Sequence, residues 1–370
     1  MRYVGLMSGT SMDGIDAVVL DVRERGFRLV ASHSHPWPDS ILDRLRALAA
    51  PGPADLDVLG ETDALAGEAM ARAVLALLDQ AGLRTDEIEA IGSHGQTVRH
   101  RPDGSPPFTL QIGDPHRIAE ITGITTVADF RRRDVAAGGQ GAPLVPGFHA
   151  AVFSDRTGRE CRGVLNVGGI ANLTVLPAAD PPSAVLGFDT GPGNCLMDGW
   201  ARRHIGAAFD RDGAFAARGS VLPGLLDAML ADVYFSRPPP KSTGPEYFSA
   251  GWLERHLAGR ADSPQDVQAT LAALTARSSA LAVERDAPAA QRVIVCGGGA
   301  HNRQLMALLR SGLPGCVVET SESHDLHPDW VEAAAFAWLA QRTLAGAPGN
   351  LPSVTGARHP VVLGAIHPGR

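Results

Sequence analysis

The chain has 370 residues, 44% of them hydrophobic, and a formal net charge of −7. This length allows two domains with full hydrophobic cores, and the composition excludes disordered and fibrous proteins. Nucleic acids and anionic membranes are usually bound by concentrated basic surfaces, so the acidic balance argues against both as partners.

The cysteines and the N-terminus indicate where the protein works. The four cysteines stand alone, without a CxxC pair, which indicates neither a zinc cage nor a disulfide framework. Met1 and Arg2 lead directly into a strand without the apolar run of a signal peptide, and no window is apolar enough for a membrane span. We therefore expect a cytoplasmic protein that binds small molecules; the sequence leaves a homodimer open.

The chain begins with a predicted β-hairpin. Apolar residues from Tyr3 lead into a turn that is rich in glycine and hydroxyl groups, and a second strand from Ile15 to Val22 leaves it. Glycine lets the backbone approach a ligand, and hydroxyls beside exposed N–H groups can hold phosphate. The Asp13-Gly14 pair is equally typical of a hairpin turn without a ligand.

Alternating strands and helices are predicted for the rest of the first half. Strands are expected at 27–32, 88–93, 108–112 and 125–128, and helices at 41–50, 55–81, 115–122 and 147–153. The strand at 88–93 delivers His94, Gln96 and Thr97 at its carboxyl end, where α/β sheets contact ligands. The arginine- and glycine-rich stretch 129–144 is predicted to be a ligand-facing loop, with an ordinary solvated turn as the alternative.

A second domain is predicted to begin near Arg162, because its start resembles the start of the chain. The run 163–176 again has the pattern of strand, glycine turn and strand, with Gly168 and Gly169 in the turn. A third strand, 184–188, ends at Asp189. The carboxylate of Asp189 is therefore expected beside glycine turns. The alternative is that this aspartate only forms a turn or caps a helix.

The remaining elements complete the second half. A helix is predicted at 265–283, a buried strand at 292–296, helices at 304–309 and 333–344, and a mostly irregular tail. The three glycines at 297–299 follow the buried strand. The sole lysine, Lys241, follows three prolines, so it could reach a phosphate or lie on the surface of a stiff loop.

The motifs of three other kinds of nucleotide-binding site are missing from the sequence. A P-loop would need a lysine after a glycine run, which Lys241 does not provide, and the Rossmann and protein-kinase patterns are missing. What remains is a set of glycine turns, each after a strand, in two similar halves. This arrangement is typical of the actin, hexokinase and Hsp70 group of folds.

Eight segments, in the expected order from the first strand to the last helix, resemble the anhydro-N-acetylmuramic acid kinase family. They are 9–16, 93–97, 129–131, 138–144, 166–172, 188–194, 239–244 and 328–333, and GTSMDGID with FDTGPGN is the most specific pair. The resemblance implies an α/β, two-domain actin-like (ribonuclease H-like) fold with a cleft between the domains. We expect domains at 1–155 and 156–370, with the last helix able to pack back on the first domain.

The resemblance also implies a reaction. Such kinases use ATP and water to open 1,6-anhydro-N-acetylmuramic acid, a product of cell-wall turnover, and make N-acetylmuramic acid 6-phosphate. Water attacks C1, the bond from C1 to O6 breaks, and O6 accepts the γ-phosphoryl group. Ring opening needs a base for the attacking water, and Asp189 is expected to be that base.

The same resemblance assigns the residues expected to bind ATP. The phosphates are expected at Gly9, Thr10, Ser11, Met12, Asp13, Gly14, Ile15 and Asp16, with opposite turns at Gly168, Gly169, Gly191 and Gly193, and adenosine at Gly297, Gly298 and Gly299. Mg²⁺ is expected at Asp13 and Asp16, directly or through water. Close helix–strand packing is the alternative explanation for the last three glycines.

The sugar is expected to contact residues from three of the matching segments. These are His94, Gln96, Thr97, Arg131 and Glu332, and the Arg131 fork suits the lactyl carboxylate. A core histidine at His94 and a helix-start glutamate at Glu332 are the alternatives. A carbohydrate kinase without ring opening, an actin-fold ATPase and a glycosidase stay open as other functions.

Overall fold

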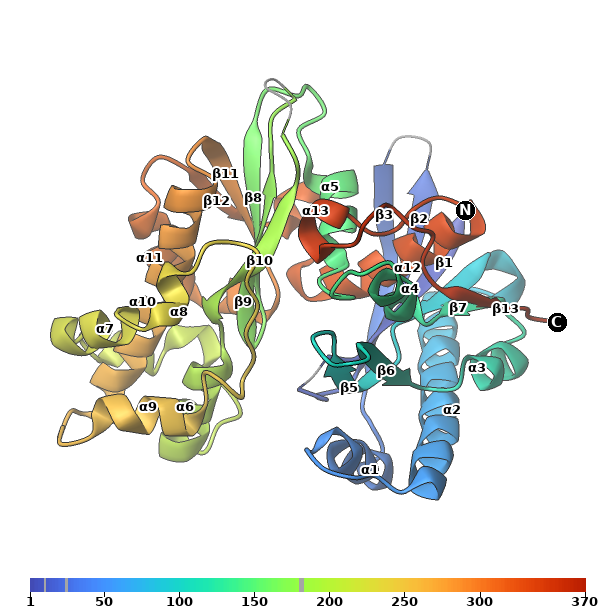
Figure 1. Ribbon diagram of the computed structural model, residues 1–370, viewed down its shortest axis with the longest axis horizontal. Coiled ribbons are helices and arrows are strands. Elements are labelled where there is room, and N and C mark those ends of the chain that lie inside the picture. Colours follow the sequence, from blue (N-terminus) through green and yellow to red (C-terminus); the bar gives the residue numbers. More distant parts are fainter. Residues whose placement is uncertain (10, 24–25, 180–182) are drawn as a thin grey trace. The chain divides into compact units, whose positions relative to one another are not determined.

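The computed structural model describes residues 1–9, 11–23, 26–179 and 183–370. Contacts between these residues divide the chain into two compact units, each with its own sheet (Figure 1). The first unit consists of Met1–Phe148 and Trp330–Arg370, and the second of His149–Asp329. The chain is thus divided at two places. From the sequence we expected one boundary after residue 155, with the last helix able to pack back on the first domain.

The first unit is built on a six-stranded sheet of order β13-β7-β4-β1-β2-β3. The strands are β1 (Arg2–Met7), β2 (Ile15–Arg23), β3 (Gly26–His35), β4 (Ala90–Ser93), β7 (Thr126–Ala128) and β13 (Ala365–His367). β1, β2 and β3 pair antiparallel, which confirms the predicted opening hairpin, while β4 runs parallel to β1 and β7 parallel to β4. The predicted irregular tail contains β13, which pairs antiparallel with β7.

Helices and a separate two-stranded ribbon surround this sheet. They are α1 (Asp39–Ala49), α2 (Leu56–Ala81), η1 (Thr85–Glu87), the ribbon strands β5 (Gln96–Arg101) and β6 (Phe108–Ile112), α3 (Pro115–Thr122), α4 (Phe130–Ala136), α12 (Val331–Leu344) and α13 (Pro352–Thr355). α5 (Val145–Phe153) spans the boundary between the units. Part of the predicted ligand-facing loop at 129–144 is therefore the helix α4, in which Phe130 and Val135 are buried.

The helix α12 belongs to the first unit because small residues allow it to approach the sheet closely. It packs on β1, β2 and β4. A side chain at Gly5 would overlap the backbone of Ala333, and one at Gly92 would overlap the backbone of Phe336. The helix is buried along most of its length, as its alanine-rich sequence permits. This packing explains why the chain returns to the first unit at Trp330.

The second unit contains a five-stranded sheet of order β10-β9-β8-β11-β12. The strands are β8 (Cys161–Val167), β9 (Ile170–Leu176), β10 (Leu186–Pro192), β11 (Ala290–Cys296) and β12 (Val317–Thr320). The helices are α6 (Cys195–Ile205), η2 (Arg211–Gly213), η3 (Ala216–Arg218), α7 (Pro223–Leu230), α8 (Val233–Ser236), α9 (Ala250–Leu257), α10 (Pro264–Asp286), η4 (Gly298–His301), α11 (Arg303–Gly312), η5 (Ser321–His324) and η6 (Pro328–Trp330). α10 is the central helix, and its side chains are buried on most sides.

The two sheets share one topology. In each, the first three strands form an antiparallel meander, and two later strands extend the sheet from the first strand in parallel. The order, numbered within each unit, is 3-2-1-4-5, with β13 added at the edge of the first sheet. This is the ribonuclease H-like order of the actin and hexokinase folds, so the predicted fold class is confirmed.

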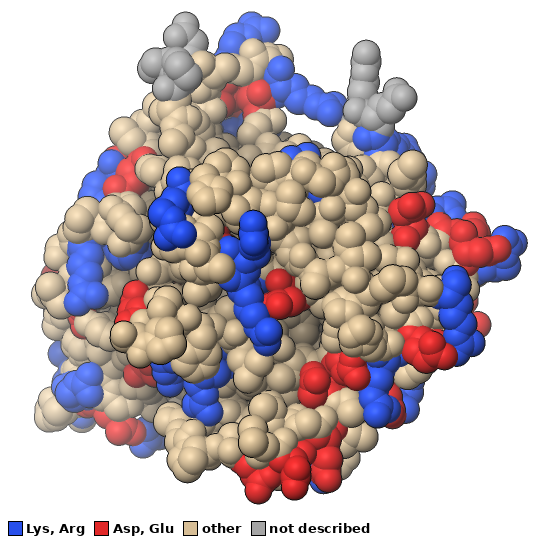
Figure 2. Space-filling view, turned by 45° about the vertical axis from the view of Figure 1, so that its right-hand side comes forward, with Lys and Arg blue, Asp and Glu red and all other residues tan. Residues whose placement is uncertain are grey.

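The charge distribution, the helices and the cysteines agree with what the composition predicted. On the face drawn in Figure 2, basic and acidic side chains are both spread among uncharged residues. Within the described part of the chain, no helix has the length and apolar character needed to cross a bilayer. All four cysteines are free thiols.

Candidate functional site

The turn between β1 and β2 is held in shape by Ser8. The Ser8 hydroxyl donates to the carbonyl of Gly14 at 2.8 Å and accepts from the indole N–H of Trp37 at 3.1 Å. Met12 adopts a left-handed conformation, with φ of 57°, and its N–H bonds the carbonyl of Gly9. Ser8 is therefore a structural residue of the turn, whose hydroxyl is used within the hairpin.

The predicted phosphate motif divides into core and exposed residues. The side chains of Met12 and Ile15 belong to the hydrophobic core, so these two residues can meet a ligand only through their backbone. Ser11 and Asp13 are exposed. Thr10, also expected to contact phosphate, lies outside the described residues.

Two carboxylates at the turn end of the hairpin fit the expected Mg²⁺ site. Asp13 is exposed, and Asp16 is half-buried where β2 begins, opposite Met7 of β1. The Ser34 hydroxyl donates to Oδ1 of Asp16 at 3.0 Å, which fixes that side chain. Because Mg²⁺ binds one or two carboxylates together with phosphate oxygens, Asp13 and Asp16 are suitable donors.

His94 and Arg131 form a buried pair next to the hairpin turn. The guanidinium Nε and one terminal nitrogen of Arg131 donate to Nε2 of His94 at 3.0 and 2.9 Å, and its other terminal nitrogen donates to the carbonyl of Gly141 at 2.8 Å. Nδ1 of His94 lies 3.2 Å from the carbonyl of Ser8. The fork that we expected at the lactyl carboxylate therefore orients His94 in this structure.

These contacts fix the protonation state of His94. Burial, aided by the charge of Arg131, holds the pKa of His94 well below its usual range. Since Nε2 accepts from a guanidinium, the proton of the neutral imidazole sits on Nδ1 and is donated to Ser8. Burial also lowers the pKa of Arg131 to about 10, against the opposing effects of Glu332 and Asp134, so Arg131 remains charged at neutral pH.

The other expected sugar residues of the first unit lie around the same place. Gln96 is fully buried and donates to the carbonyl of Gly9 at 3.1 Å, while its Oε1 is buried without a hydrogen-bond partner. The Thr97 hydroxyl accepts from Gln111 at 3.1 Å, and Glu332 is close enough to Arg131 to raise its pKa. The structure thus brings Gln96, Arg131 and His94 together with the hairpin turn.

A pocket of about 300 Å³ opens beside His94 in the first unit. Its lining includes Ser93 at the end of β4, Ala128 and Asp129 at the end of β7, and Gly113 at the end of β6. In α/β sheets, ligands bind outside the carboxyl ends of parallel strands. The pocket therefore gives the first unit a suitable concave surface for a small polar ligand.

In the second unit, the expected phosphate glycines meet at one end of the sheet. The N–H groups of Gly193 and Asn194 donate to the carbonyls of Gly169 and Gly168 at 2.9 and 2.8 Å. The Asn194 amide donates to the carbonyl of Val167 at 3.0 Å and lies 3.8 Å from a Cβ built on Gly298. The β8–β9 turn, the end of β10 and the loop after β11 are thus neighbours.

The glycines of these loops fall into two groups. A side chain at Gly193 would overlap the backbone of Gly168, and side chains at Gly297 and Gly299 would overlap Asn166 and Val167. These three are glycine because of packing, as are Gly191 beside Phe235 and, less tightly, Gly14 beside His35. By contrast, a Cβ would have no atom closer than 3.6 Å at Gly9, Gly168, Gly169 and Gly298. Packing does not explain this second group, whereas the close approach of a ligand would.

Asp189 lies inside β10 rather than after it, at an irregularity of the strand. The pairing of β10 with β9 shifts between Asp189 and Gly191, and such bulges re-aim side chains next to functional sites. The N–H of Thr243 donates to Oδ2 of Asp189 at 2.9 Å, and the Tyr234 hydroxyl donates to its backbone carbonyl at 2.7 Å. Asp189 is thereby held by β9 on one side and by the 234–243 segment on the other.

Burial tunes both Asp189 and its neighbour Lys241. It raises the pKa of Asp189 to about 6, although the Thr243 N–H and the charge of Lys241 act in the opposite direction. It lowers the pKa of Lys241 to about 8. The Lys241 ammonium lies 4.7 Å from the ring centre of Tyr234 and donates to the carbonyl of that residue at 3.3 Å. A carboxylate with a pKa near neutrality is suited to general base catalysis.

The environment of Asp189 could not be predicted from the sequence. Lys241 and Thr243 lie in the segment 239–244, which resembles the family. The sequence gave no sign that this segment contacts Asp189, because the two are far apart along the chain. Asn194 was likewise recognised only as part of a motif. No local pattern shows which carboxylate a distant loop will cover, so only the fold reveals these partners.

Comparisons with known proteins identify one family over the whole chain. A family model described as anhydro-N-acetylmuramic acid kinase matches residues 1–369. The relative from Xylella fastidiosa (strain Temecula1), named anhydro-N-acetylmuramic acid kinase, is 52% identical, covering 99% of this chain and 96% of the relative. The protein of the same name from Xanthomonas campestris pv. campestris (strain 8004) is 54% identical, covering 99% and 97%. Among solved structures, component A of (R)-2-hydroxyglutaryl-CoA dehydratase from Acidaminococcus fermentans is 13% identical with a TM-score of 0.48, covering 91% of this chain and 98% of that one.

Proposed function

Since the chain belongs to the anhydro-N-acetylmuramic acid kinase family, a family of sugar kinases of cell-wall recycling, we propose that it couples ring opening to phosphorylation. Its substrates in this proposal are 1,6-anhydro-N-acetylmuramic acid, water and ATP. Water adds to C1, the C1–O6 bond breaks, and O6 takes the γ-phosphoryl group, giving N-acetylmuramic acid 6-phosphate and ADP. The observation that carries the proposal is the half-buried Asp189 carboxylate with a pKa near 6.

Asp189 acts as the base for the attacking water. Its Oδ2 is held by the Thr243 N–H, and Lys241 supplies a nearby positive charge. The β10 bulge sets the direction of the side chain. A carboxylate held in this way can take a proton from water at C1 while O6 leaves on the opposite face of the ring.

The residues around His94 bind the sugar in this proposal. His94 and Arg131 form a hydrogen-bonded pair of a neutral imidazole and a cation, and Gln96 contributes a buried amide. Thr97 and Glu332 are the other two residues that we propose to bind the sugar. Arg131 contributes through the imidazole that it orients and through its charge, which attracts the lactyl carboxylate. Of these five residues only His94 lines the pocket described above, so we assign the sugar to the surroundings of His94 and not to that pocket as a whole.

The open glycines bind the phosphates of ATP. Gly9 in the first unit and Gly168, Gly169 and Gly298 in the second lack side chains without a packing reason. Backbone N–H groups at such turns stabilise phosphoryl oxygens. Asp13 and Asp16 would hold Mg²⁺, which neutralises charge on the transferring phosphoryl group.

The test is the substitution Asp189→Asn. A positioned base contributes roughly 10² to 10⁴ in rate, so we expect turnover to fall by that factor while ATP binding persists. When the parent protein reacts in isotopically labelled water, the sugar product should carry the label at C1. Asp227→Asn, an exposed aspartate on α7, is the matched control.

Folding can be checked separately in the same variant. The folded pKa of Asp189 lies above its usual value, so its contribution to stability is present at low pH and is lost as pH rises through about 6. A neutral asparagine should therefore not lower Tm at pH 7. Near-parental turnover in folded Asp189→Asn would show that another group is the base.

A further inference from the structure

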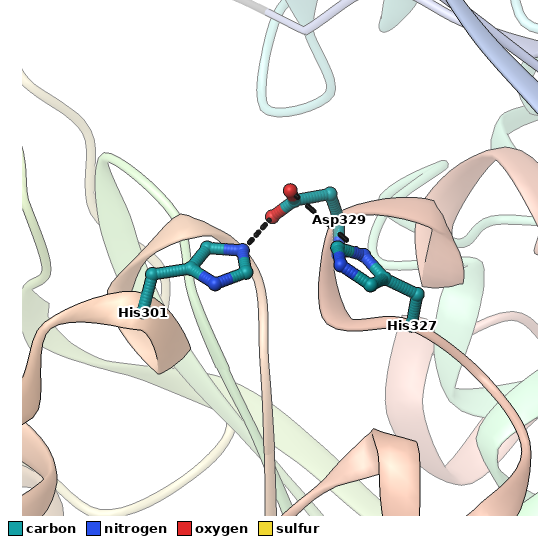
Figure 3. Close-up of side chains that lie close together, drawn as sticks. All are labelled: His301, His327 and Asp329. Carbon is teal, nitrogen blue, oxygen red and sulfur yellow. Dashed lines mark hydrogen bonds and ion pairs between the residues drawn. The ribbon is translucent and has the colours of Figure 1, made fainter.

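Three side chains to which the proposed function assigns no role gather on the surface of the second unit. His301 lies at the end of η4, and His327 and Asp329 lie in the segment that follows η5 (Figure 3). Nε2 of His301 is 2.8 Å from Oδ1 of Asp329, and Nδ1 of His327 is 3.9 Å from Oδ2. One nitrogen or oxygen from each of the three lies within 4.8 Å of the others.

The backbone holds the two loops of this cluster together. The N–H of Gly297 donates to the carbonyl of Pro328 at 3.0 Å, which joins the loop after β11 to the 327–329 segment. Asn302, next to His301, caps α11 by accepting from the N–H of Leu305 at 3.0 Å. The His301 backbone is thus fixed on one side by the glycine loop and on the other by a helix cap.

Hydrogen bonds bring the three side chains together in this structure. Nε2 of His301 pairs with Oδ1 of Asp329 at 2.8 Å, and the N–H of Asp329 donates to Nδ1 of His327 at 3.4 Å. The two imidazole rings are 5.5 Å apart between centres. Two imidazoles beside a carboxylate are a common donor set for a transition-metal ion.

The distances fit such an ion. Zn²⁺ binds imidazole nitrogen and carboxylate oxygen at about 2.0–2.2 Å in tetrahedral geometry, which places donor atoms roughly 3.4 Å apart. The two nitrogen–oxygen separations, 2.8 Å to Oδ1 and 3.9 Å to Oδ2 of Asp329, lie on either side of that value.

We propose that His301, His327 and Asp329 form a binding site for a divalent transition-metal ion of the Zn²⁺ class, with water at the fourth position. Two nitrogen donors distinguish this site from the all-oxygen Mg²⁺ site at Asp13 and Asp16. A bound ion would link the glycine loop at 297–299 to the 327–329 segment and make both more rigid. The proposal does not depend on the sugar kinase activity.

The experiment measures Zn²⁺ binding by the full chain after chelator treatment and dialysis. Calorimetric titration with Zn²⁺ alone should show one equivalent bound with a micromolar Kd, unaffected by excess Mg²⁺. Asp329→Ala should weaken this binding at least tenfold, and His301→Ala with His327→Ala should abolish it. His359→Ala, which removes an exposed histidine of the first unit, should leave it unchanged.

Other histidine pairs require their own control. His33 with His35 and His116 with His367 have ring nitrogens 3.3 Å apart, so His33→Ala with His35→Ala and His116→Ala with His367→Ala should also be titrated. The proposal expects the micromolar equivalent to persist in both. It is overturned if either double variant removes that equivalent, if the His301/His327 variant keeps it, or if the parent binds no Zn²⁺ in this range.

A second readout does not rely on the variants being folded. Zn²⁺ should protect His301 and His327 of the parent protein from acylation by diethyl pyrocarbonate, measured by mass spectrometry. Exposed His359 should react equally with and without the ion. Equal modification of His301 with and without Zn²⁺ would refute the site.

Discussion

At the scale of residues, Asp189 and Lys241 have opposite pKa shifts for one physical reason. Burial disfavours the charged form of each, so it raises the pKa of the carboxyl to about 6 and lowers that of the ammonium to about 8. Between these values both groups are charged. The carboxylate is then a competent base, and the neighbouring cation prevents its pKa from rising further.

This pair predicts a specific pH dependence. The kcat/KM of the sugar kinase reaction should rise as pH increases through about 6, because the base form of Asp189 appears there. In Lys241→Met, loss of the positive charge should move this acidic limb to higher pH. Lys241→Arg keeps the charge and should leave the limb near its parental position. A flat profile between pH 5 and 7, or identical limbs in the parent and Lys241→Met, would contradict the assignment.

His94 shows what a resemblance can and cannot supply for a single residue. The sequence indicated both His94 and Arg131 as sugar residues, but it gave no reason for them to touch each other. The structure shows two donors of Arg131 directed at Nε2 of His94, which fixes its tautomer. The contact between the two residues depends on packing, so it could not be predicted from the sequence.

At the scale of elements, the glycine loops of the second unit contain both closely packed and open positions. Gly193 sits against the backbone of Gly168, where no side chain fits, while a Cβ on Gly168 would be 3.6 Å from its nearest neighbour. The two residues belong to adjacent loops that share hydrogen bonds. They form a matched pair for substitution by alanine.

The two alanine variants should fail in different ways. Gly193→Ala should destabilise the fold by about 1–3 kcal/mol, because the β8–β9 turn must shift. Gly168→Ala should change the free energy of unfolding by less than about 0.5 kcal/mol, yet raise the KM for ATP roughly tenfold, a loss of about 1.4 kcal/mol in binding. Thermal denaturation and steady-state kinetics measure the two effects. Equal losses of stability in both variants would mean that Gly168 is structural as well.

Element prediction succeeded where the periodicity was strong and failed where pairing or packing decided. The amphipathic helix α2 and the strand β6 were predicted closely, because apolar spacing and flanking glycines mark them. The short edge strand β13 was not, because its residues are mostly exposed and only pairing with β7 makes them a strand. α4 was taken for a loop because its arginines and the glycines that follow it obscured the buried Phe130 and Val135.

At the scale of the whole molecule, the two units are assembled from the chain in different ways. The second unit is a single stretch with a core of its own, from Cys161 to Val318. The first unit is made of two stretches, because α12 packs on β1, β2 and β4, and β13 extends the sheet beside β7. The sequence revealed the repeated strand pattern of the two halves. It allowed the last helix to pack back on the first domain, but it did not identify Gly5 and Gly92 as the residues against which alanine-rich α12 packs, because these contacts are long-range.

This difference predicts that only the second unit folds from one continuous piece of chain. A polypeptide of residues 145–329, which keeps α5 intact, should unfold in one cooperative transition in urea, because its core is complete and His149 of α5 bonds Thr174 of β9 at 2.9 Å. Residues 1–144 alone should show no such transition, since β1 and β4 would lose the helix that covers them. Adding residues 330–370 as a separate peptide should restore cooperative unfolding, and a peptide of the same composition in shuffled order should not. Circular dichroism measures all four samples, and cooperative unfolding of 1–144 by itself would show that α12 is dispensable for the first unit.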